Sequence, residues 1–224
     1  MLTTVAFDAD NTLVDTWDAV QVALGVIVAD LAEPALTFDV FRADAERVWA
    51  SRPELPVWEQ RRASLEYTLA RVGREDEINR VAELFFDTRF AHSRPFPGVP
   101  ELLAKLRTDY KIGYATNGNS QAERCGLAGL FDFELYAMRG DVPKKPEPRF
   151  YQAVAELAQA RPENIAYVGD EYENDVVGPA VFGMKTVWLN RSGRPLPSSP
   201  SGGVQPDAVI ENLDDLPRIL AGWC

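Results

Sequence analysis

The 224-residue sequence contains only one histidine, His92, and only two cysteines, Cys125 and Cys224. A single histidine gives little support to a Ser-His-Asp mechanism, and we expect His92 to lie at the surface or at a hinge. Two cysteines cannot build a disulfide framework, and without a C-x-x-C pair nothing points to a zinc site. Any catalytic chemistry must therefore come from other residue types.

Long apolar runs and an excess of basic residues are also missing. The longest apolar run, residues 22–29, is far too short to cross a bilayer, and the first seven residues have no basic and apolar leader pattern. The net charge of −11 argues against a nucleic-acid polymer or an anionic membrane as a partner. We therefore expect a cytoplasmic protein, whose small anionic substrate would be chosen by local charge. The sequence does not indicate the oligomeric state.

The composition is that of a globular protein, with 46% hydrophobic and 25% charged residues. A short apolar run, Val5-Ala6-Phe7, predicts a buried parallel strand near the start. Residues 16–91 then show only helical spacing, with breaks at Pro34, before Pro53 and at Gly73. This pattern predicts a four-helix bundle inserted after the first strand.

From residue 92 onward, short apolar runs alternate with helical patterns, which indicates βαβ units and a parallel sheet. The fold class is therefore α/β, a Rossmann-like parallel sheet with helices on both faces, formed by residues 1–15 and 92–224, with residues 16–91 as an all-helical cap. The expected strands are 112–115, 133–136, 165–168, 186–189 and 208–210. The expected helices are 100–108, 120–127, 148–160, 174–182 and 213–220, and residues 191–206 form a surface loop.

Two carboxylates, Asp8 and Asp10, follow the first predicted strand. Ligands of open α/β sheets bind at the carboxyl ends of the strands. Two acids about 4 Å apart would repel each other by roughly 4 kcal/mol at an effective dielectric constant near 20. A hard divalent cation such as Mg²⁺ would compensate this repulsion, since it prefers oxygen ligands.

Three later loops place further polar residues at the same edge. In the first, the Thr116 hydroxyl and the amides of Asn117 and Gly118, at the start of an expected helix, could hold a phosphate. In the second, a lysine before proline, Lys145, is a compact positive charge suited to phosphate, although its neighbour Lys144 is a close rival.

The third loop, residues 169–175, adds carboxylates to the same edge. Asp170 and Asp175 are the candidate metal-binding residues, and Asp175 could alternatively cap a helix. Glu171 and Glu173 are expected to be solvated.

These groups fit the hydrolysis of a phosphate monoester, an extremely slow reaction without catalysis. Asp8 could attack phosphorus and form an aspartyl-phosphate. Asp10 could protonate the leaving alkoxide and then deprotonate the attacking water. Thr116 and Lys145 would hold the phosphoryl oxygens, and Mg²⁺ would neutralise charge.

The motifs and their order resemble the haloacid dehalogenase-like hydrolase superfamily, in the subfamily with a helical cap after the first motif. Asp8-x-Asp10-x-Thr12 is similar to the first motif, and the later motifs match Thr116, Lys145-Pro146 and the pair Asp170 and Asp175. The resemblance implies that Mg²⁺ is bound by the Asp8 side chain, the Asp10 main-chain carbonyl and Asp170, with Asp175 as a direct or water-mediated ligand. Residues 7–16 are also similar to the N-acetylneuraminate-9-phosphatase and pyrimidine 5′-nucleotidase group.

Three other functions stay open at this point: a phosphomutase, a 2-haloacid dehalogenase and a metal-stabilised binding protein. Displacement of a halide needs no proton donor, so Asp10 argues against the dehalogenase. The substrate is expected to be a small phosphorylated metabolite, a sugar phosphate or a nucleotide monophosphate, selected by cap residues that the pattern does not identify. Most tryptophans of the cap are expected in its core, and Arg61-Arg62 on a solvated face.

Overall fold

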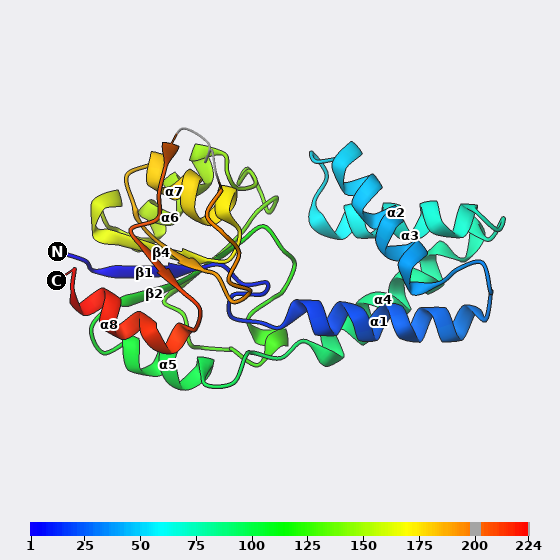
Figure 1. Cartoon of the computed structure of the whole chain (residues 1–224), viewed down its shortest axis with the longest axis horizontal. Coiled ribbons are helices and arrows are strands. Elements are labelled where there is room, and N and C mark those ends of the chain that lie inside the picture. Colours follow the sequence, from blue (N-terminus) through cyan, green and yellow to red (C-terminus); the bar gives the residue numbers. More distant parts are fainter. Residues whose placement is uncertain (198–202, 224) are drawn as a thin grey trace.

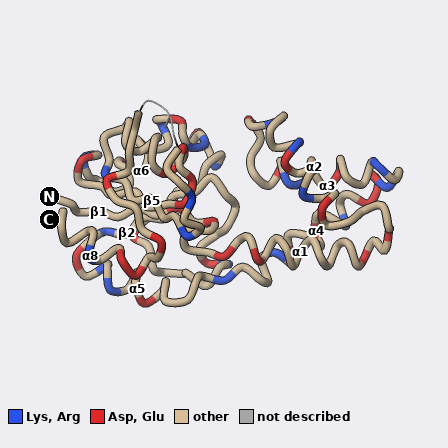
Figure 2. Tube along the Cα trace, viewed as in Figure 1, with Lys and Arg blue, Asp and Glu red and all other residues tan. Residues whose placement is uncertain are grey.

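The computed structural model describes residues 1–197 and 203–223 (Figure 1). Part of the loop predicted over residues 191–206, and Cys224, lie outside the described residues. Among the described helices, none has the length and apolar character that a membrane crossing requires. Acidic and basic residues are distributed along the whole chain, so the negative net charge is not confined to one region (Figure 2).

A six-stranded parallel sheet with the order β3-β2-β1-β4-β5-β6 forms the centre of the larger region. Short buried runs form its middle strands, as expected where helices cover both faces. Phe7 pairs in register with Tyr114 on one side and Val168 on the other, so the loops after these strands leave at the same edge. The strands are β1 (Thr4–Phe7), β2 (Lys111–Thr116), β3 (Phe133–Tyr136), β4 (Ile165–Gly169), β5 (Lys185–Leu189) and β6 (Ala208–Ile210).

Helices cover both faces of this sheet, which confirms the predicted fold class (Figure 1). On one face lie α5 (Val99–Leu106) and α8 (Leu216–Ala221), whose leucines share a buried cluster with β1 and β2. On the other face lie α6 (Pro148–Ala158) and α7 (Gly178–Val181), and the α6 side chains pack in a second buried cluster with Tyr167.

The remaining helices form a separate region beyond the carboxyl end of β1 (Figure 1). They are α1 (Thr16–Leu31), α2 (Phe38–Ser51), α3 (Val57–Ala70) and α4 (Ile78–His92), and a single-turn 3₁₀ helix, Glu75–Glu77, precedes α4. Buried apolar side chains from all four helices form a core of their own, which includes Ile27, Phe41, Leu65, Val81 and Phe85. We call α1–α4 the helical region and the rest the sheet region.

Three local helix predictions were wrong in whole or in part. Residues 120–127 form no α-helix and contain only a 3₁₀ turn at Glu123–Cys125. Two tyrosines hold this segment in an irregular path, because the Tyr114 hydroxyl donates to the Ser120 carbonyl (2.6 Å) and the Ala122 N–H donates to the Tyr136 hydroxyl (3.1 Å). The Thr116 loop therefore does not lead into a helix N-terminus.

The helix predicted over residues 174–182 begins earlier and in a different form. A π-helical turn, Tyr172–Val177, comes first, and only the short α7 follows. The wider turn lets the Asp175 carboxylate accept the Glu171 N–H at 2.9 Å while the side chain stays buried beside Gly169. A single-turn 3₁₀ helix, Leu213–Asp215, likewise precedes α8 where one continuous helix was expected.

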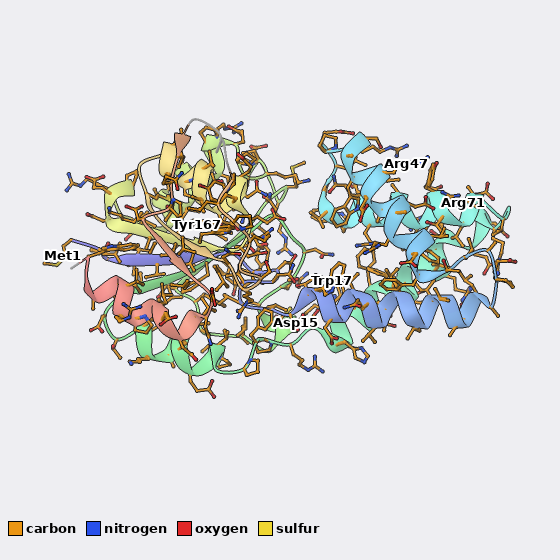
Figure 3. All side chains as sticks on the ribbon, in the orientation of Figure 1. Met1, Asp15, Trp17, Arg47, Arg71 and Tyr167 are labelled. Atoms are coloured by element: carbon orange, nitrogen blue, oxygen red, sulfur yellow. The ribbon has the colours of Figure 1, made fainter. Side chains whose placement is uncertain are left out.

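A buried carboxylate in the helical region leads to a stability prediction. Asp44 is almost fully buried, and both of its oxygens accept hydrogen bonds from the Arg71 guanidinium (2.6 and 2.7 Å); Figure 3 shows Arg71 on the outer part of this region. We expect Asp44→Asn to lower the free energy of unfolding by about 1–3 kcal/mol, because the charge-assisted bonds are lost. Urea denaturation followed by circular dichroism measures this. Asp39→Asn, at an exposed pair 3.9 Å from Arg42, should change little.

The same contact predicts the direction of a pH effect. Burial alone would raise the pKa of Asp44, but the hydrogen bonds from Arg71 and Thr68 outweigh burial and lower the pKa below its ordinary value. The stabilisation is therefore complete above about pH 3.9 and is lost as the pH falls through the lowered pKa. An equal destabilisation by Asp44→Asn at neutral pH and in strong acid would contradict this assignment.

Candidate functional site

The parallel register of the sheet determines which side chains meet. Asp8 follows β1, Thr116 ends β2 and Asp170 follows β4, and these three strands are neighbours. Lys145 comes from the loop before α6, and Asp175 comes from the π-helical turn after β4. These five residues are far apart in the sequence and were predicted from their motifs. The structure places them at or beside the carboxyl edge of the central strands.

Lys145 links two of these acids. Its ammonium group donates to Asp8 Oδ1 at 2.6 Å and to Asp175 Oδ1 at 2.7 Å, and all three side chains are buried. The two carboxylates raise the pKa of Lys145 even though burial opposes its charge. Lys145 is therefore a fixed positive charge at the base of the site.

The carboxylates at this edge carry more negative charge than the single Lys145 ammonium group offsets. Oxygens of Asp8, Asp170 and Asp175 lie within 4.8 Å of one another. Burial raises the pKa of Asp8, and Lys145 only partly offsets it; burial, with Asp175 and Glu171, raises the pKa of Asp170 to about 7. The cluster thus favours an added positive charge, and an all-oxygen donor set is suited to Mg²⁺ or a similar hard cation.

The three carboxylates are not equivalent as ligands. Both oxygens of Asp175 already accept hydrogen bonds, one from Lys145 and the other from the Glu171 N–H. The Asp170 carboxylate accepts a hydrogen bond on Oδ1, from the Thr12 hydroxyl at 3.2 Å. Asp8 and Asp170 are therefore better placed to hold a cation directly, and Asp175 is better placed to support them.

Asp10 is held separately from this cluster. Its Oδ1 accepts hydrogen bonds from the Thr16 hydroxyl (2.7 Å) and the Ser120 hydroxyl, and it lies 3.5 Å from the Arg89 guanidinium. Its Oδ2 lies over Gly118, where an added Cβ would approach it to 2.1 Å. Glycine at this position therefore leaves room for the Asp10 carboxylate.

The two polar side chains after β2 are used differently from each other. The Thr116 hydroxyl oxygen accepts the Gly118 N–H at 2.9 Å, which leaves its own proton free to be donated. The Asn117 side chain exchanges two hydrogen bonds with the main chain of Lys145, at 2.7 and 3.0 Å. The Asn117 side chain thus positions the lysine loop, and its main-chain amide is the part left for a phosphate.

Lys144 contacts the helical region. Its ammonium group donates to the main-chain carbonyls of Pro53 and Leu55 (3.1 and 3.0 Å) and to the Gln60 side chain at 3.3 Å. These contacts connect the sheet region to the α2–α3 connection and α3. Lys144 is therefore neither a solvated lysine nor a partner of the acid cluster.

A cavity of about 500 Å³ lies between the two regions. Its floor includes Asp8, Asp10 and Lys145, and its walls in the helical region combine apolar and polar side chains. Trp17 and Trp49 line it and remain 54% and 37% exposed, so neither belongs to the core of the helical region. Figure 3 shows Trp17 at the start of α1, where that helix leaves the sheet region.

Sequence reasoning missed three residues of this site: Ser120, Arg89 and Arg61. Ser120 and Arg89 hold Asp10, yet they come from separate segments without a motif of their own. Arg61 was expected on a solvated face, but it is partly buried and lines the cavity. Arg89 falls at the spacing of the buried apolar residues of α4, and a charged residue at such a position was the available signal.

An α/β sheet with acids at the ends of its central strands, and a helical insertion over that edge, is the architecture of a class of hydrolases. A family model described as haloacid dehalogenase-like hydrolase matches residues 2–183, and the chain belongs to this family. The protein is therefore a hydrolase, as the resemblance implied.

Relatives in this family carry different names. N-acylneuraminate-9-phosphatase of Mus musculus is 28% identical, with 96% of this chain and 92% of the relative covered. Pyrimidine 5′-nucleotidase YjjG of Escherichia coli is 30% identical, with 64% of each covered. Among solved structures, a 2-haloacid dehalogenase from Pseudomonas syringae pv. Tomato DC3000 has a TM-score of 0.79 and 28% identity, with both chains fully covered.

Proposed function

We propose that this protein is a Mg²⁺-dependent phosphatase that hydrolyses a small phosphate monoester through an aspartyl-phosphate on Asp8. The observation that carries the proposal is the arrangement of charges under the cavity. Lys145 pairs with Asp8 and Asp175, while a second acid, Asp10, is held apart by its own hydrogen bonds. The phosphatase names of two relatives support the same class of reaction.

In the first step, an Asp8 oxygen forms a bond to phosphorus and the bond from phosphorus to the ester oxygen breaks. The electron pair of that bond goes to the leaving oxygen, which takes a proton from Asp10. Lys145 and the Thr116 hydroxyl stabilise the charge on the phosphoryl oxygens.

In the second step, Asp10 removes a proton from water, and the water oxygen bonds to phosphorus. The bond to Asp8 breaks and inorganic phosphate leaves. Asp10 returns to its protonated form in this step, so each turnover leaves both acids as they began. The three contacts on Asp10 Oδ1 keep its carboxylate in one orientation for both transfers.

The site fits a bound Mg²⁺. The Asp8 and Asp170 side chains and the Asp10 main-chain carbonyl would hold it, with Asp175 supporting them through Lys145 and the Glu171 N–H. When bound, Mg²⁺ would offset repulsion between the nucleophile and the phosphoryl oxygens. The raised pKa values of Asp8 and Asp170 support a cation at this place.

We further propose that α1–α4 act as a cap over the cavity. The helical region supplies the walls of the cavity, and the Lys144 contacts hold it against the sheet region. Such a cap would exclude water from the phosphoryl group and select the leaving alcohol. The proposed substrate is a small phosphorylated metabolite of the cytoplasm, either a sugar phosphate or a nucleotide monophosphate. A nucleic-acid polymer is not the proposed substrate.

A 2-haloacid dehalogenase is the second candidate, favoured by the structural similarity to the Pseudomonas enzyme. Displacement of halide from carbon needs a nucleophilic carboxylate but no acid for the leaving group. The fixed position of Asp10 and the cluster of three acids therefore favour the phosphatase.

The direct test is hydrolysis of p-nitrophenyl phosphate. We expect Mg²⁺-dependent release of inorganic phosphate, loss of activity with EDTA, and recovery when Mg²⁺ is restored, because the acid cluster needs a cation. A matched assay measures halide release from 2-chloropropionate. Halide release without phosphatase activity would select the second candidate, and full phosphatase activity in EDTA would remove the metal from the mechanism.

A further inference from the structure

Arg61, on α3, is an unusual cation in the helical region. Six other arginines there donate to an acid, a hydroxyl or an amide oxygen, and these are Arg47, Arg62, Arg71, Arg74, Arg80 and Arg89. Arg42 also lines the cavity, but it is exposed and lies 3.9 Å from the Asp39 carboxylate as an ion pair. Within residues 1–197 and 203–223, no hydrogen bond or ion pair is found for the Arg61 guanidinium. Its neighbour in sequence, Arg62, is exposed and donates to Asn79 at 2.7 Å.

Aromatic rings hold the Arg61 guanidinium in place. Its central carbon lies 5.0 Å from the ring centre of Trp49 and 5.0 Å from that of Phe85. Such contacts stabilise a cation and orient it, but they leave its N–H groups without acceptors. The side chain is therefore placed by α2 and α4 before any ligand binds.

The surroundings of Arg61 favour an anionic ligand. Arg61 lines the same cavity as Asp8 and Lys145. Burial, with the positive charge of Arg89, lowers the pKa of Arg61 to about 10, so it remains charged at neutral pH. Glu46 also lines the cavity, but it forms no ion pair with Arg61 in the described part of the chain. The open donors of this positioned cation are therefore available to an anion that enters the cavity.

The position of Arg61 separates it from the phosphoryl site proposed above. Lys145 and Thr116, which belong to the sheet region, are the proposed partners of the transferred group, whereas Arg61 belongs to the wall formed by α3. A volume of about 500 Å³ leaves space for a leaving group of many atoms beside the phosphoryl group.

We propose that Arg61 binds a second anionic group of the substrate, so that preferred substrates are phosphate monoesters whose alcohol carries a carboxylate or a further phosphate. This inference rests on the proposed phosphatase function. A guanidinium can donate two parallel hydrogen bonds to a carboxylate or to a phosphate, so Arg61 would bind either group in the same way.

Matched substrate pairs test the proposal. One pair is phenyl phosphate and 4-carboxyphenyl phosphate, and the other is fructose 6-phosphate and fructose 1,6-bisphosphate. For wild-type protein with Mg²⁺, we expect a higher kcat/KM for the anionic member of at least one pair, and the pair that responds identifies carboxylate or phosphate as the second group.

Substitution of the arginine then assigns the preference. Arg61→Gln should lower kcat/KM for the preferred anionic member by roughly 10- to 100-fold, mainly through KM, and leave the neutral member within about 3-fold. Arg61→Lys, which keeps the charge, should retain part of the preference. Arg62→Gln is the matched control and should leave both members unchanged.

Three results would overturn the inference. The first is the absence of a wild-type preference for the anionic member in both pairs, which needs no variant. The second is an equal loss for both members in a folded Arg61→Gln protein, which would place Arg61 on the transferred phosphate. The third is an equal effect of Arg62→Gln. If p-nitrophenyl phosphate is hydrolysed in the same assays, these failures leave the phosphatase proposal intact, whereas absence of that activity rejects the phosphatase itself.

Discussion

Asp8→Asn is expected to lower the rate of phosphate release by roughly 10⁴-fold or more, as removal of a nucleophile does in other enzymes. The neutral amide is a poor nucleophile and also a weaker ligand for a cation. The fold should persist, because the amide has nearly the shape of the carboxylate and Lys145 keeps its ion pair with Asp175 at 2.7 Å. Steady-state phosphate release from p-nitrophenyl phosphate measures the effect.

The control for this variant is Asp141→Asn, an exposed acid outside the cavity lining, which should keep wild-type activity. Circular dichroism of both variants would show whether the fold is retained. If Asp8→Asn keeps an activity within 10-fold of wild type, Asp8 is rejected as the nucleophile. A 10-fold loss corresponds to an increase of only about 1.4 kcal/mol in the activation free energy.

Asp10→Asn should produce a loss that depends on the leaving group. For an alkyl phosphate such as fructose 6-phosphate, we expect kcat to fall by about 10²- to 10⁴-fold, because the leaving alkoxide needs a proton. For p-nitrophenyl phosphate, the first step should be much less affected, since nitrophenolate leaves without one. Burst kinetics would then show rapid release of one equivalent of nitrophenolate followed by slow turnover.

Thr16→Val is the companion variant for Asp10. It removes one hydrogen bond to Asp10 Oδ1 but leaves the Ser120 hydroxyl and Arg89 in place, so a smaller loss of the same kind is expected. An equal loss for both leaving groups in Asp10→Asn, with no burst, would show that Asp10 acts by orienting other groups and transfers no proton.

The sheet and the approximate positions of the strands could be predicted because short buried apolar runs leave few alternatives. The parallel arrangement then predicts that the loops after neighbouring strands meet at one edge, and the register of Phe7 with Tyr114 and Val168 shows how closely they do. The segment at residues 120–127 could not be predicted this way. Its path depends on hydrogen bonds to Tyr114 and Tyr136, which are tertiary contacts that local propensity does not encode.

The site shows the same division between local and tertiary information. Asp8, Lys145, Asp170 and Asp175 stand at recognisable places in the chain, and the structure brings them together. Ser120 and Arg89, which hold Asp10, could not be found from pattern, because neither stands in a motif that marks it.

The cavity-lining residues of the helical region were the hardest to predict from the sequence pattern. Spacing identified the helices, but it could not separate a tryptophan in the core from one that lines a cavity. Trp17 and Trp49 line the cavity between the two regions, and Arg61 lies against the Trp49 ring. These residues acquire their position only when α1, α2 and α3 pack together over the sheet region. If the helical region selects the leaving group, as proposed above, that selection depends on the part of the fold that is hardest to predict from sequence.

The central claim is that Asp8 becomes covalently phosphorylated during turnover. The most direct measurement is acid quenching of Asp10→Asn with p-nitrophenyl phosphate and Mg²⁺, followed by mass spectrometry of the peptide that contains residues 1–42. We expect this peptide to carry one phosphoryl group on Asp8, to lose it on treatment with hydroxylamine, and to lack it in Asp8→Asn. Release of phosphate by wild-type protein with no phosphorylated Asp8 at any quench time would contradict the account.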